Sequence, residues 1–534
     1  MNAQAIPLRI YHIDLNLERY RFRFYLSLLD RIAAWGYNAV MIQYGDMFPY
    51  KTHPSIPNPD HWTPSQIGRF CRAAESRSLD IIPMVQSFGH LGIMLRNPGY
   101  FELCEDPTQQ GGVVESICPL NPRAVEVVRG MHREMIAAHP GSRLICLGGD
   151  EALMGVCPAC RRHVEHVGLG RHYADHMQPS LEIVLAAGKR PIIWADMVER
   201  HQDALAHIDR RTILGDWGYY VRSLHWHTAV AKGNDTSYRV TPHSLGRLPL
   251  ALRRRYEPYW SYGVQEYPRK FHGFPYIRYL MDKGFDVIFC ASMKCSGDSA
   301  TSVRYDLHLD NCLAAAEAVA EAGALGIMTC HFAAKMTPHE NQFLGAAVAA
   351  QAYLRPGRTD PERAAATYER KTFGKACGLL DIYRKLGELT GFCNTNFFGD
   401  YDGYRMVPKS IPEQMKLAQG DPELALMRTD QAESWIRRSG IDHREIDVLH
   451  YSINELAYKA RLVQAYEQWR GNEKSVDWRT VHHEMIRVRR LFERTFRTTY
   501  PPWTLAMARD FRFAADETWI RQRLDAPRQR KTKK

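Results

Sequence analysis

Two adjacent carboxylates, Asp150 and Glu151, stand after an apolar run and a pair of glycines. The run, residues 144–147, predicts a short buried strand. Because side chains alternate faces along a regular strand, two neighbouring acids can enter one pocket only where the strand becomes irregular. Gly148 and Gly149 would provide that irregularity, since glycine adopts backbone conformations that other residues avoid. The stretch therefore predicts a pair of acids that share one pocket and perform acid–base chemistry.

The same stretch also has a purely structural interpretation. Asp150 would cap the N-terminus of a helix, and Glu151 would lie favourably in the field of that helix dipole. The catalytic interpretation is favoured because polar and aromatic residues recur at the ends of the other predicted strands. These residues are His12 and Asp14; Gln43, Tyr44 and Asp46; Gln86, Phe88 and His90; Trp194 and Asp196; Asp216, Trp217 and Tyr219; Ser292 and Lys294; and His331.

Carboxylates beside aromatic side chains suit one class of ligand in particular. The apolar faces of a sugar ring stack on aromatic rings, while the sugar hydroxyls need hydrogen-bond partners. We therefore expect a carbohydrate pocket among these strand ends.

The elements that must carry these residues alternate between short apolar runs and helical segments. The predicted strands cover 8–15, 39–44, 81–86, 144–147, 191–195, 212–216, 286–291 and 324–330. Helices are expected to begin at Pro64 and Pro122, each preceded by a capping residue, and one long helix is expected over 158–187. Eight such units predict an α/β fold, a (β/α)8 TIM barrel with its chemistry at the C-terminal ends of the strands. Residues 217–280 show little periodicity and are expected to form long loops.

The pattern changes after residue 357. Residues 360–534 are rich in Arg, Glu, Ala and Leu and predict helices, with an irregular insert at 394–400 that would belong to a site or an interface. We therefore expect a catalytic barrel over 1–355 and a mainly α-helical C-terminal region with a basic tail over 356–534. The helical region would either pack on the barrel or form a homodimer interface.

Charge and composition exclude several functional classes. The formal net charge is +11, and residues 521–534 carry seven Lys or Arg against one Asp. We interpret this run as a solvated tail and do not expect nucleic-acid binding, because no base-stacking or helix-turn-helix pattern accompanies it. The N-terminus lacks a signal-peptide pattern, and no apolar run is long enough to span a membrane. Twelve scattered cysteines then indicate reduced thiols in a cytoplasmic protein.

With these residues in view, the chain resembles glycoside hydrolase family 20, the β-N-acetylhexosaminidases, and within it the hexosaminidase D-like branch. The resemblance covers roughly residues 6–355, and its most specific part is the Gly-Asp-Glu end of the fourth strand. The matching segments are Tyr44-Gly-Asp-Met-Phe-Pro-Tyr50, Pro83-Met-Val-Gln-Ser-Phe-Gly-His90, Cys118-Pro-Leu-Asn-Pro122, Leu147-Gly-Gly-Asp-Glu151, Trp194-Ala-Asp-Met197 and Ala291-Ser-Met-Lys294.

The resemblance implies an exo-acting hydrolase that removes terminal β-linked N-acetylglucosamine or N-acetylgalactosamine with retention, without a cofactor or a metal. In this family the 2-acetamido oxygen of the substrate attacks the anomeric carbon. Glu151 would then be the general acid and base, and we expect burial and the adjacent carboxylate to raise its pKa. Asp150 would stay ionised and orient the acetamido group.

The same resemblance assigns further residues to the substrate pocket. These residues are Asp46, His90, Trp194, Asp196, Trp217 and Tyr219. The two Trp side chains would flank the acetamido group, and Tyr219, placed there by its proximity alone, would hydrogen-bond the acetamido oxygen. Core packing of each Trp and a structural role for His90 are the alternatives.

Two departures from the family pattern affect the far side of the sugar. Many family members carry an Arg just after the first strand, where this sequence reads His12-Ile-Asp-Leu-Asn16. The eighth strand typically ends in a Trp, where this sequence reads Thr329-Cys-His-Phe332. The contacts to the sugar hydroxyls are therefore expected to differ from the usual set.

Three other interpretations stay open. Cys157-Pro-Ala-Cys160 with His163 and His166 resembles a zinc site, but the two His are closer than is usual, and ordinary reduced thiols are the favoured interpretation. His12 and Asp14 would suit a metal-dependent TIM-barrel hydrolase, but most later strands lack a partner His. A non-catalytic sugar-binding barrel is the third possibility, although such a protein would not need both acids.

Overall fold

The computed structural model describes residues 4–107, 115–232, 237–260, 270–295, 297–332, 336–389, 399–402, 405–418, 420–473 and 475–525. Eight parallel strands close a barrel in the order β1-β12-β11-β6-β5-β4-β3-β2. They are β1 (Leu8–Asp14), β2 (Ala39–Gln43), β3 (Asp80–Met84), β4 (Leu144–Cys146), β5 (Arg190–Trp194), β6 (Ile213–Trp217), β11 (Asp286–Lys294) and β12 (Gly326–His331). The predicted (β/α)8 barrel and its eight strands are confirmed.

Alternate residues of these strands fill the interior of the barrel. Ile10, Met41, Ile82, Ile192 and Met328 belong to one buried apolar cluster with their counterparts on the remaining strands. The residues between them face outward and join a second cluster under the surrounding helices. This alternation follows from the two-residue period of a strand, and it makes the barrel a packed core rather than a pore.

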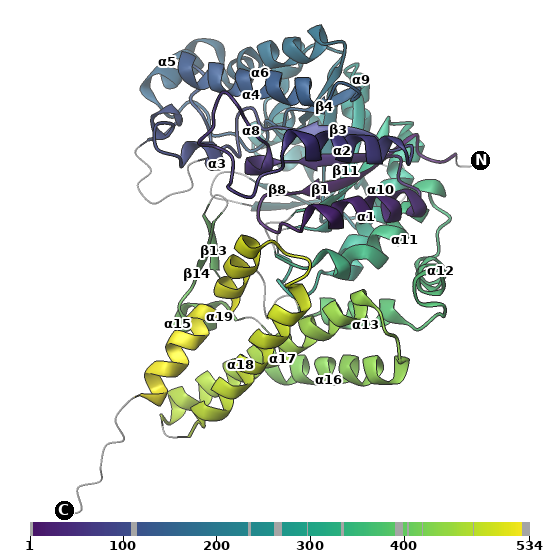
Figure 1. Cartoon of the computed structure of the whole chain (residues 1–534). Helices are drawn as coiled ribbons and strands as arrows, with labels where there is room; N and C mark the ends of the chain where they lie inside the picture. Colours follow the sequence, from purple (N-terminus) through teal and green to yellow (C-terminus); the bar gives the residue numbers. More distant parts are fainter. Residues whose placement is uncertain are drawn as a thin grey trace, which may run out of the picture.

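Helices cover the outside of the barrel, as Figure 1 shows. They are α1 (Phe22–Trp35), α2 (Pro64–Glu75), α4 (Pro122–Ala138), α5 (Pro158–Val167), α6 (Leu169–Ala186), α10 (Tyr305–Ala322) and α11 (Phe343–Leu354), with the shorter α3 (Gly92–Leu95), α7 (Asp196–Arg200) and α9 (Pro275–Asp282). Thr63 and Asn121 cap α2 and α4, as predicted. The single helix predicted over 158–187 is wrong, because Gly168 has φ +83° and separates α5 from α6.

The connection between β6 and β11 is long, as predicted for residues 217–280, but it contains short elements. They are β7 (His225–Trp226), β8 (Ala229–Lys232), β9 (Ser237–Val240), α8 (Leu250–Trp260) and β10 (Phe271–His272). The strands form two antiparallel pairs, β8 with β9 and β7 with β10. Strands of two to four residues are too short to give a detectable period in the sequence.

The C-terminal region is helical, as predicted. Its helices are α12 (Pro361–Phe373), α13 (Leu379–Gly387), α15 (Ile411–Leu417), α16 (Pro422–Ser439), α17 (Arg444–Gly471), α18 (Trp478–Phe496) and α19 (Pro502–Leu524). One strand pair, β13 (Gly399–Asp402) with β14 (Arg405–Pro408), was not expected. Most of the predicted insert at 394–400 lies outside the described residues, as does the basic tail after residue 525. The domain division at residue 355 stays a prediction.

The helices α16 to α19 form a bundle on one side of the barrel (Figure 1). Buried polar contacts join this bundle to the loops that leave the barrel strands. The hydroxyl of Tyr500 donates to Glu18 after β1 at 3.0 Å, and Glu18 pairs at 2.8 Å with Lys294 at the end of β11. From α19, Arg512 donates to the carbonyls of Ala300 and Met336. The C-terminal region therefore fixes loops at the C-terminal end of the barrel.

Among the described helices, none combines the length and the apolar character that a membrane span needs.

Arg512→Met tests how firmly this bundle is held. The Arg512 guanidinium pairs with Glu455 at 2.6 Å, and both side chains are buried. Because the substitution leaves a buried carboxylate without its cation, we expect a loss of about 3–5 kcal/mol of stability, seen as a lower thermal midpoint. Arg521→Met, which breaks an exposed pair with Glu517, should cost less than about 1 kcal/mol. Equal shifts for the two variants would contradict the anchoring role of Arg512.

Candidate active site

The acid pair lies on an irregular turn at the C-terminal end of β4. The strand ends at Cys146, and Gly148, Gly149 and Glu151 have φ values of +62°, +88° and +46°. A Cβ at Gly148 would clash with the amide of Gln86, and the backbone N–H of Gly149 donates to Gln86 Oε1 at 3.2 Å. The predicted irregularity is therefore present, and it requires glycine.

The helix-cap interpretation of the acid pair is wrong. The next helix, α5, begins only at Pro158, and its N-cap is Cys157. Residues 151–157 form a loop, so neither Asp150 nor Glu151 caps a helix.

His90 joins the acid pair to the loop after β3. Its Nε2 lies 3.1 Å from Asp150 Oδ2 and 3.3 Å from Glu151 Oε2, and its Nδ1 lies 3.0 Å from Glu115 Oε2. His90 has φ +53°, and a Cβ at the preceding Gly89 would clash with the carbonyl of Asp150. The loops after β3 and β4 are therefore in direct contact, and one imidazole contacts three carboxylates.

The protonation states in this cluster follow from that contact. The charge of Asp150 raises the pKa of His90 well above its ordinary value, against the effect of burial, and hydrogen bonds to the three carboxylates add to the rise. The hydrogen bond from His90 lowers the pKa of Glu151, with burial opposing it. The sequence predicted a raised pKa for Glu151. That prediction is wrong for the protein without substrate, because His90 is cationic and 51% of the Glu151 side chain is exposed.

Asp196 holds the backbone of the acid pair. Its Oδ2 accepts the N–H of Glu151 at 3.1 Å, which supports the left-handed backbone of that residue. Burial raises the pKa of Asp196 to about 7, and the charge of Asp150 adds to the effect. Asp196 begins α7 directly after β5, so the observed contact is to the turn; its predicted contact with substrate stays a prediction.

The aromatic residues line the same end of the barrel. Trp194 is buried at the end of β5, where its ring covers Gly215. Trp217 is the last residue of β6 and Tyr219 follows it; both are half-buried, and their rings stack with centroids 5.3 Å apart. Tyr219 also meets Phe332, which follows β12, at 5.6 Å. These rings cap the interior cluster of the barrel and form an apolar wall.

Asp46, at the end of β2, forms an ion pair with Arg19. Arg19 is 1% exposed and also donates to the carbonyls of Leu15 and Asn16, while its Nη1 has no hydrogen-bond partner among the described residues. Burial raises the pKa of Asp46, and the charge of Arg19 opposes this. The guanidinium lies 4.7 Å from the ring of Trp503 on α19. Arg19 lies three residues after the segment 12–16, which contains no Arg, and its role was not predicted.

Asp216 in β6 and Glu199 in α7 form a second carboxyl pair. Burial raises the pKa of Asp216 to about 7, and burial together with the charge of Asp216 raises that of Glu199 well above its ordinary value. The hydrogen bond between the two carboxyl groups opposes the rise in the pKa of Asp216. Asp216 was noted at a strand end, but Glu199 was missed because it lies in α7, one turn after Asp196.

The predicted zinc ligands are not brought together as a set. Cys157 and Cys160 lie close to each other, but His163 packs against His172, and His166 is exposed in the last turn of α5. The cysteines instead meet Cys118 and Glu105. The His part of the prediction is wrong because α5 directs its later residues away from its N-cap.

Part of the chain is similar to known proteins of one family. Residues 32–238 match the family model described as glycosyl hydrolase family 20, catalytic domain. Human hexosaminidase D is 29% identical over 214 residues, which are 38% of this chain and 43% of that protein. Bovine hexosaminidase D is 30% identical over 211 residues, which are 36% of this chain and 56% of that protein. The chain thus spans about half the length of the curated relatives it matches.

Among solved structures, the β-N-acetylhexosaminidase from Bacteroides fragilis NCTC 9343 is 12% identical, covers 68% of this chain and 70% of that chain, and superposes with a TM-score of 0.47. The resemblance inferred from the sequence is confirmed for the segment that carries the acid pair, which matches the family 20 model and is similar to hexosaminidase D. The matched segment includes β2 to β6, while β1, β11 and β12 lie outside it.

His90→Gln tests the charge of the imidazole. A raised pKa means that the folded protein binds the proton more tightly than the unfolded chain does. The stability that His90 contributes is therefore fully present below about pH 6.5 and is lost as the pH rises through the raised value. We expect wild type to unfold at a higher temperature than His90→Gln at acidic pH, with the difference shrinking at alkaline pH.

The control is His243→Gln, which changes an exposed His far from the acid pair in sequence. Its thermal midpoint should follow wild type at every pH. A difference between wild type and His90→Gln that did not vary with pH would contradict a cationic His90.

Proposed function

We propose that this hexosaminidase D-like member of family 20 is a glycoside hydrolase that removes terminal β-linked N-acetylglucosamine or N-acetylgalactosamine with retention. The main support is the meeting of Asp150, Glu151 and His90 at the C-terminal end of β4. In TIM barrels this end of the strands carries the chemistry.

The proposed mechanism uses the substrate as its own nucleophile. The acetamido oxygen attacks the anomeric carbon while Glu151 protonates the leaving oxygen, and Asp150 accepts a hydrogen bond from the acetamido N–H and stabilises the positive charge that develops there. Glu151 then takes a proton from the water that opens the cyclic intermediate. A fixed turn suits these paired roles, because neither acid has to move between the two steps.

Glu151 needs a proton in the first step, although its pKa is lowered in the free protein. A sugar that covers the half-exposed carboxyl would remove water from it and raise its pKa. His90 carries a proton 3.3 Å from Glu151 Oε2 and would share it with the carboxylate as the sugar binds. We assign to His90 the role of setting the proton balance between the two acids.

The remaining predicted residues would surround the sugar. Trp194 and Trp217 would wall the acetamido group, and the hydroxyl of Tyr219 would donate to its oxygen. Asp46, held in place by its ion pair with the buried Arg19, would bind the sugar hydroxyls.

A metal-dependent hydrolase is the second candidate. It is favoured by one observation, that the possible ligand atoms of His90, Asp150 and Glu151 lie within 4.8 Å of one another. The raised pKa of His90 and its contact with Glu115 argue for a proton rather than a metal at this position. His12 and Asp14 are less suitable ligands, since each accepts a backbone N–H, from His331 and Asn16 respectively. If a metal at the acid pair were catalytic, His90→Ala would lose metal and activity together.

Glu151→Gln tests the assignment of the general acid. We expect wild type to release nitrophenol from the 4-nitrophenyl β-glycosides of both sugars or of one of them. The variant should lose about 10²–10⁴-fold in kcat on a β-linked disaccharide of N-acetylglucosamine, and less on the nitrophenyl glycosides, because nitrophenol leaves without much help from an acid. The measurement is steady-state kinetics on both kinds of substrate.

The matched control is Glu126→Gln, an exposed carboxylate on α4 that should leave both rates unchanged. Equal losses on the two kinds of substrate would argue against Glu151 as the acid. If a folded wild-type protein released no nitrophenol, the hydrolase proposal would be rejected in favour of a non-catalytic sugar-binding barrel. For such a barrel, Glu151→Gln would not alter ligand affinity.

Asp150→Asn tests the participation of the acetamido group. We expect wild type to bind a thiazoline analogue of the cyclic intermediate tightly and to leave 4-nitrophenyl β-glucoside, which lacks the acetamido group, intact. The variant should lose kcat and thiazoline affinity together, because the developing positive charge has lost its carboxylate partner. Calorimetric titration gives the affinities. Hydrolysis of the glucoside at a comparable rate would exclude the substrate-assisted mechanism.

A further inference from the structure

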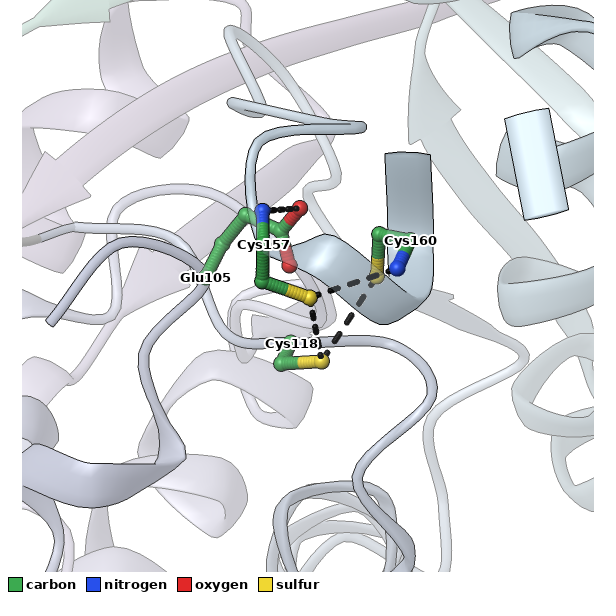
Figure 2. Close-up of side chains that lie close together, drawn as sticks. All are labelled: Glu105, Cys118, Cys157 and Cys160. Atoms are coloured by element: carbon green, nitrogen blue, oxygen red, sulfur yellow. Dashed lines mark hydrogen bonds between the residues drawn. The ribbon is translucent and has the colours of Figure 1, made fainter. Parts of the chain in front are cut away.

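Three cysteines and a glutamate converge beside the loop that follows the acid pair (Figure 2). Glu105 and Cys118 come from the connection between β3 and α4, while Cys157 caps α5 and Cys160 lies in its first turn. The sulfur of Cys118 is 3.7 Å from that of Cys157 and 3.6 Å from that of Cys160. One ligand atom from each of the four residues lies within 4.8 Å of the others.

These sulfur separations fit a shared metal ion. In a tetrahedral zinc site each Zn–S bond is about 2.3 Å, which places two thiolate sulfurs about 3.8 Å apart. A disulfide would need its two sulfurs about 2.05 Å apart. A pair of free thiols would also not account for the third sulfur and the carboxylate in the cluster. The geometry therefore matches the edges of a coordination tetrahedron.

Burial and charge also point to a cation. Glu105 is fully buried, its Oε1 accepts the N–H groups of Val156 and Cys157, and its Oε2 has no hydrogen-bond partner among the described residues. Among the described residues, no Lys or Arg forms an ion pair with this carboxylate. A buried carboxylate is stable only with a counter-charge or a full set of hydrogen bonds. A metal ion at the centre of the cluster would supply both the charge and the missing partner.

We propose that Cys118, Cys157, Cys160 and Glu105 bind a structural zinc ion. Thiolate ligands select zinc over magnesium or calcium, and four protein ligands leave no open position for catalysis. The set differs from the one that the sequence suggested, because Cys118 and Glu105 replace His163 and His166. This proposal does not depend on the proposed glycosidase activity.

The ion would hold together the two loops that frame the acid pair. Between Glu105 and Cys118 lie Glu115, which contacts His90, and Ser116, whose hydroxyl accepts the N–H of Leu153. The other two ligands end the loop that begins at Glu151. Zinc would thus fix the distance between the loop that positions His90 and the loop that carries the acids, without touching a substrate.

The test is the metal content of the full-length protein, purified under reducing conditions and analysed by inductively coupled plasma mass spectrometry. We expect about one zinc per chain for wild type, and less than about a tenth of that for Cys118→Ser and Cys160→Ser. Cobalt(II) exchanged into wild type should give the visible spectrum of a tetrahedral thiolate site. Three matched controls, Cys71→Ser, His163→Ala and His166→Ala, should keep the zinc.

Glu105→Gln provides a second, milder variant. It keeps the shape of the side chain and an oxygen for the two backbone N–H groups, so it should fold while binding zinc at least about tenfold more weakly. Its thermal midpoint should fall at a lower concentration of a zinc chelator than the midpoint of wild type does. This comparison remains decisive if a serine variant fails to fold.

Two results would overturn the proposal. One is a reduced, folded wild-type protein that contains no zinc and takes up neither zinc nor cobalt(II). The other is a disulfide between Cys118 and either Cys157 or Cys160, found by peptide mapping of protein prepared without reductant. The metal content of that protein would then stay the same when the disulfide is reduced. Loss of zinc in His163→Ala or His166→Ala, with retention in Glu105→Gln, would reassign the ligands and reject this set.

Discussion

The contact of one imidazole with three carboxylates is the interaction on which the arrangement of this site depends. His90 follows β3, whereas Asp150 and Glu151 follow β4, and neither loop is regular where they meet. The positive φ values of His90 and Glu151 are unfavourable for residues with a Cβ, and they persist because the ion-pair contacts and the hydrogen bond to Asp196 offset their cost. Electrostatic attraction at the top of the barrel therefore offsets local backbone strain.

Much of the barrel could be predicted from the sequence, because its determinants are local. The two-residue period of the strands, the capping residues before Pro64 and Pro122, and the double glycine each act within a few positions of the chain. The acid pair could be predicted for the same reason. The two-residue elements between β6 and β11 are too short to leave such a signal, and Gly168 divides a helix whose apolar pattern continues across it.

The residues that the sequence analysis missed act over long sequence distances. Glu115 lies 36 positions before Glu151 and reaches the acids through His90, while Cys118 lies 39 positions before Cys157. Arg19 was missed because it turns back along the loop after β1 to meet Asp46. The protonation of Glu151 could not be inferred either, since adjacency to Asp150 suggested repulsion and only the fold brings a cation between them.

The C-terminal helices have a part in the site that follows from where their polar groups are buried. Glu18, between β1 and α1, has Lys294 as its cation and Tyr500 as a hydrogen-bond donor, so a barrel loop and the bundle share one buried charge. Burial raises the pKa of Glu18, and the charge of Lys294 opposes it, which makes the pair costly to separate. Arg19, the next residue, lies between Asp46 and the ring of Trp503. A displacement of the bundle would therefore move the Arg19–Asp46 pair, and the bundle is better regarded as a wall of the site than as an appendage to the barrel.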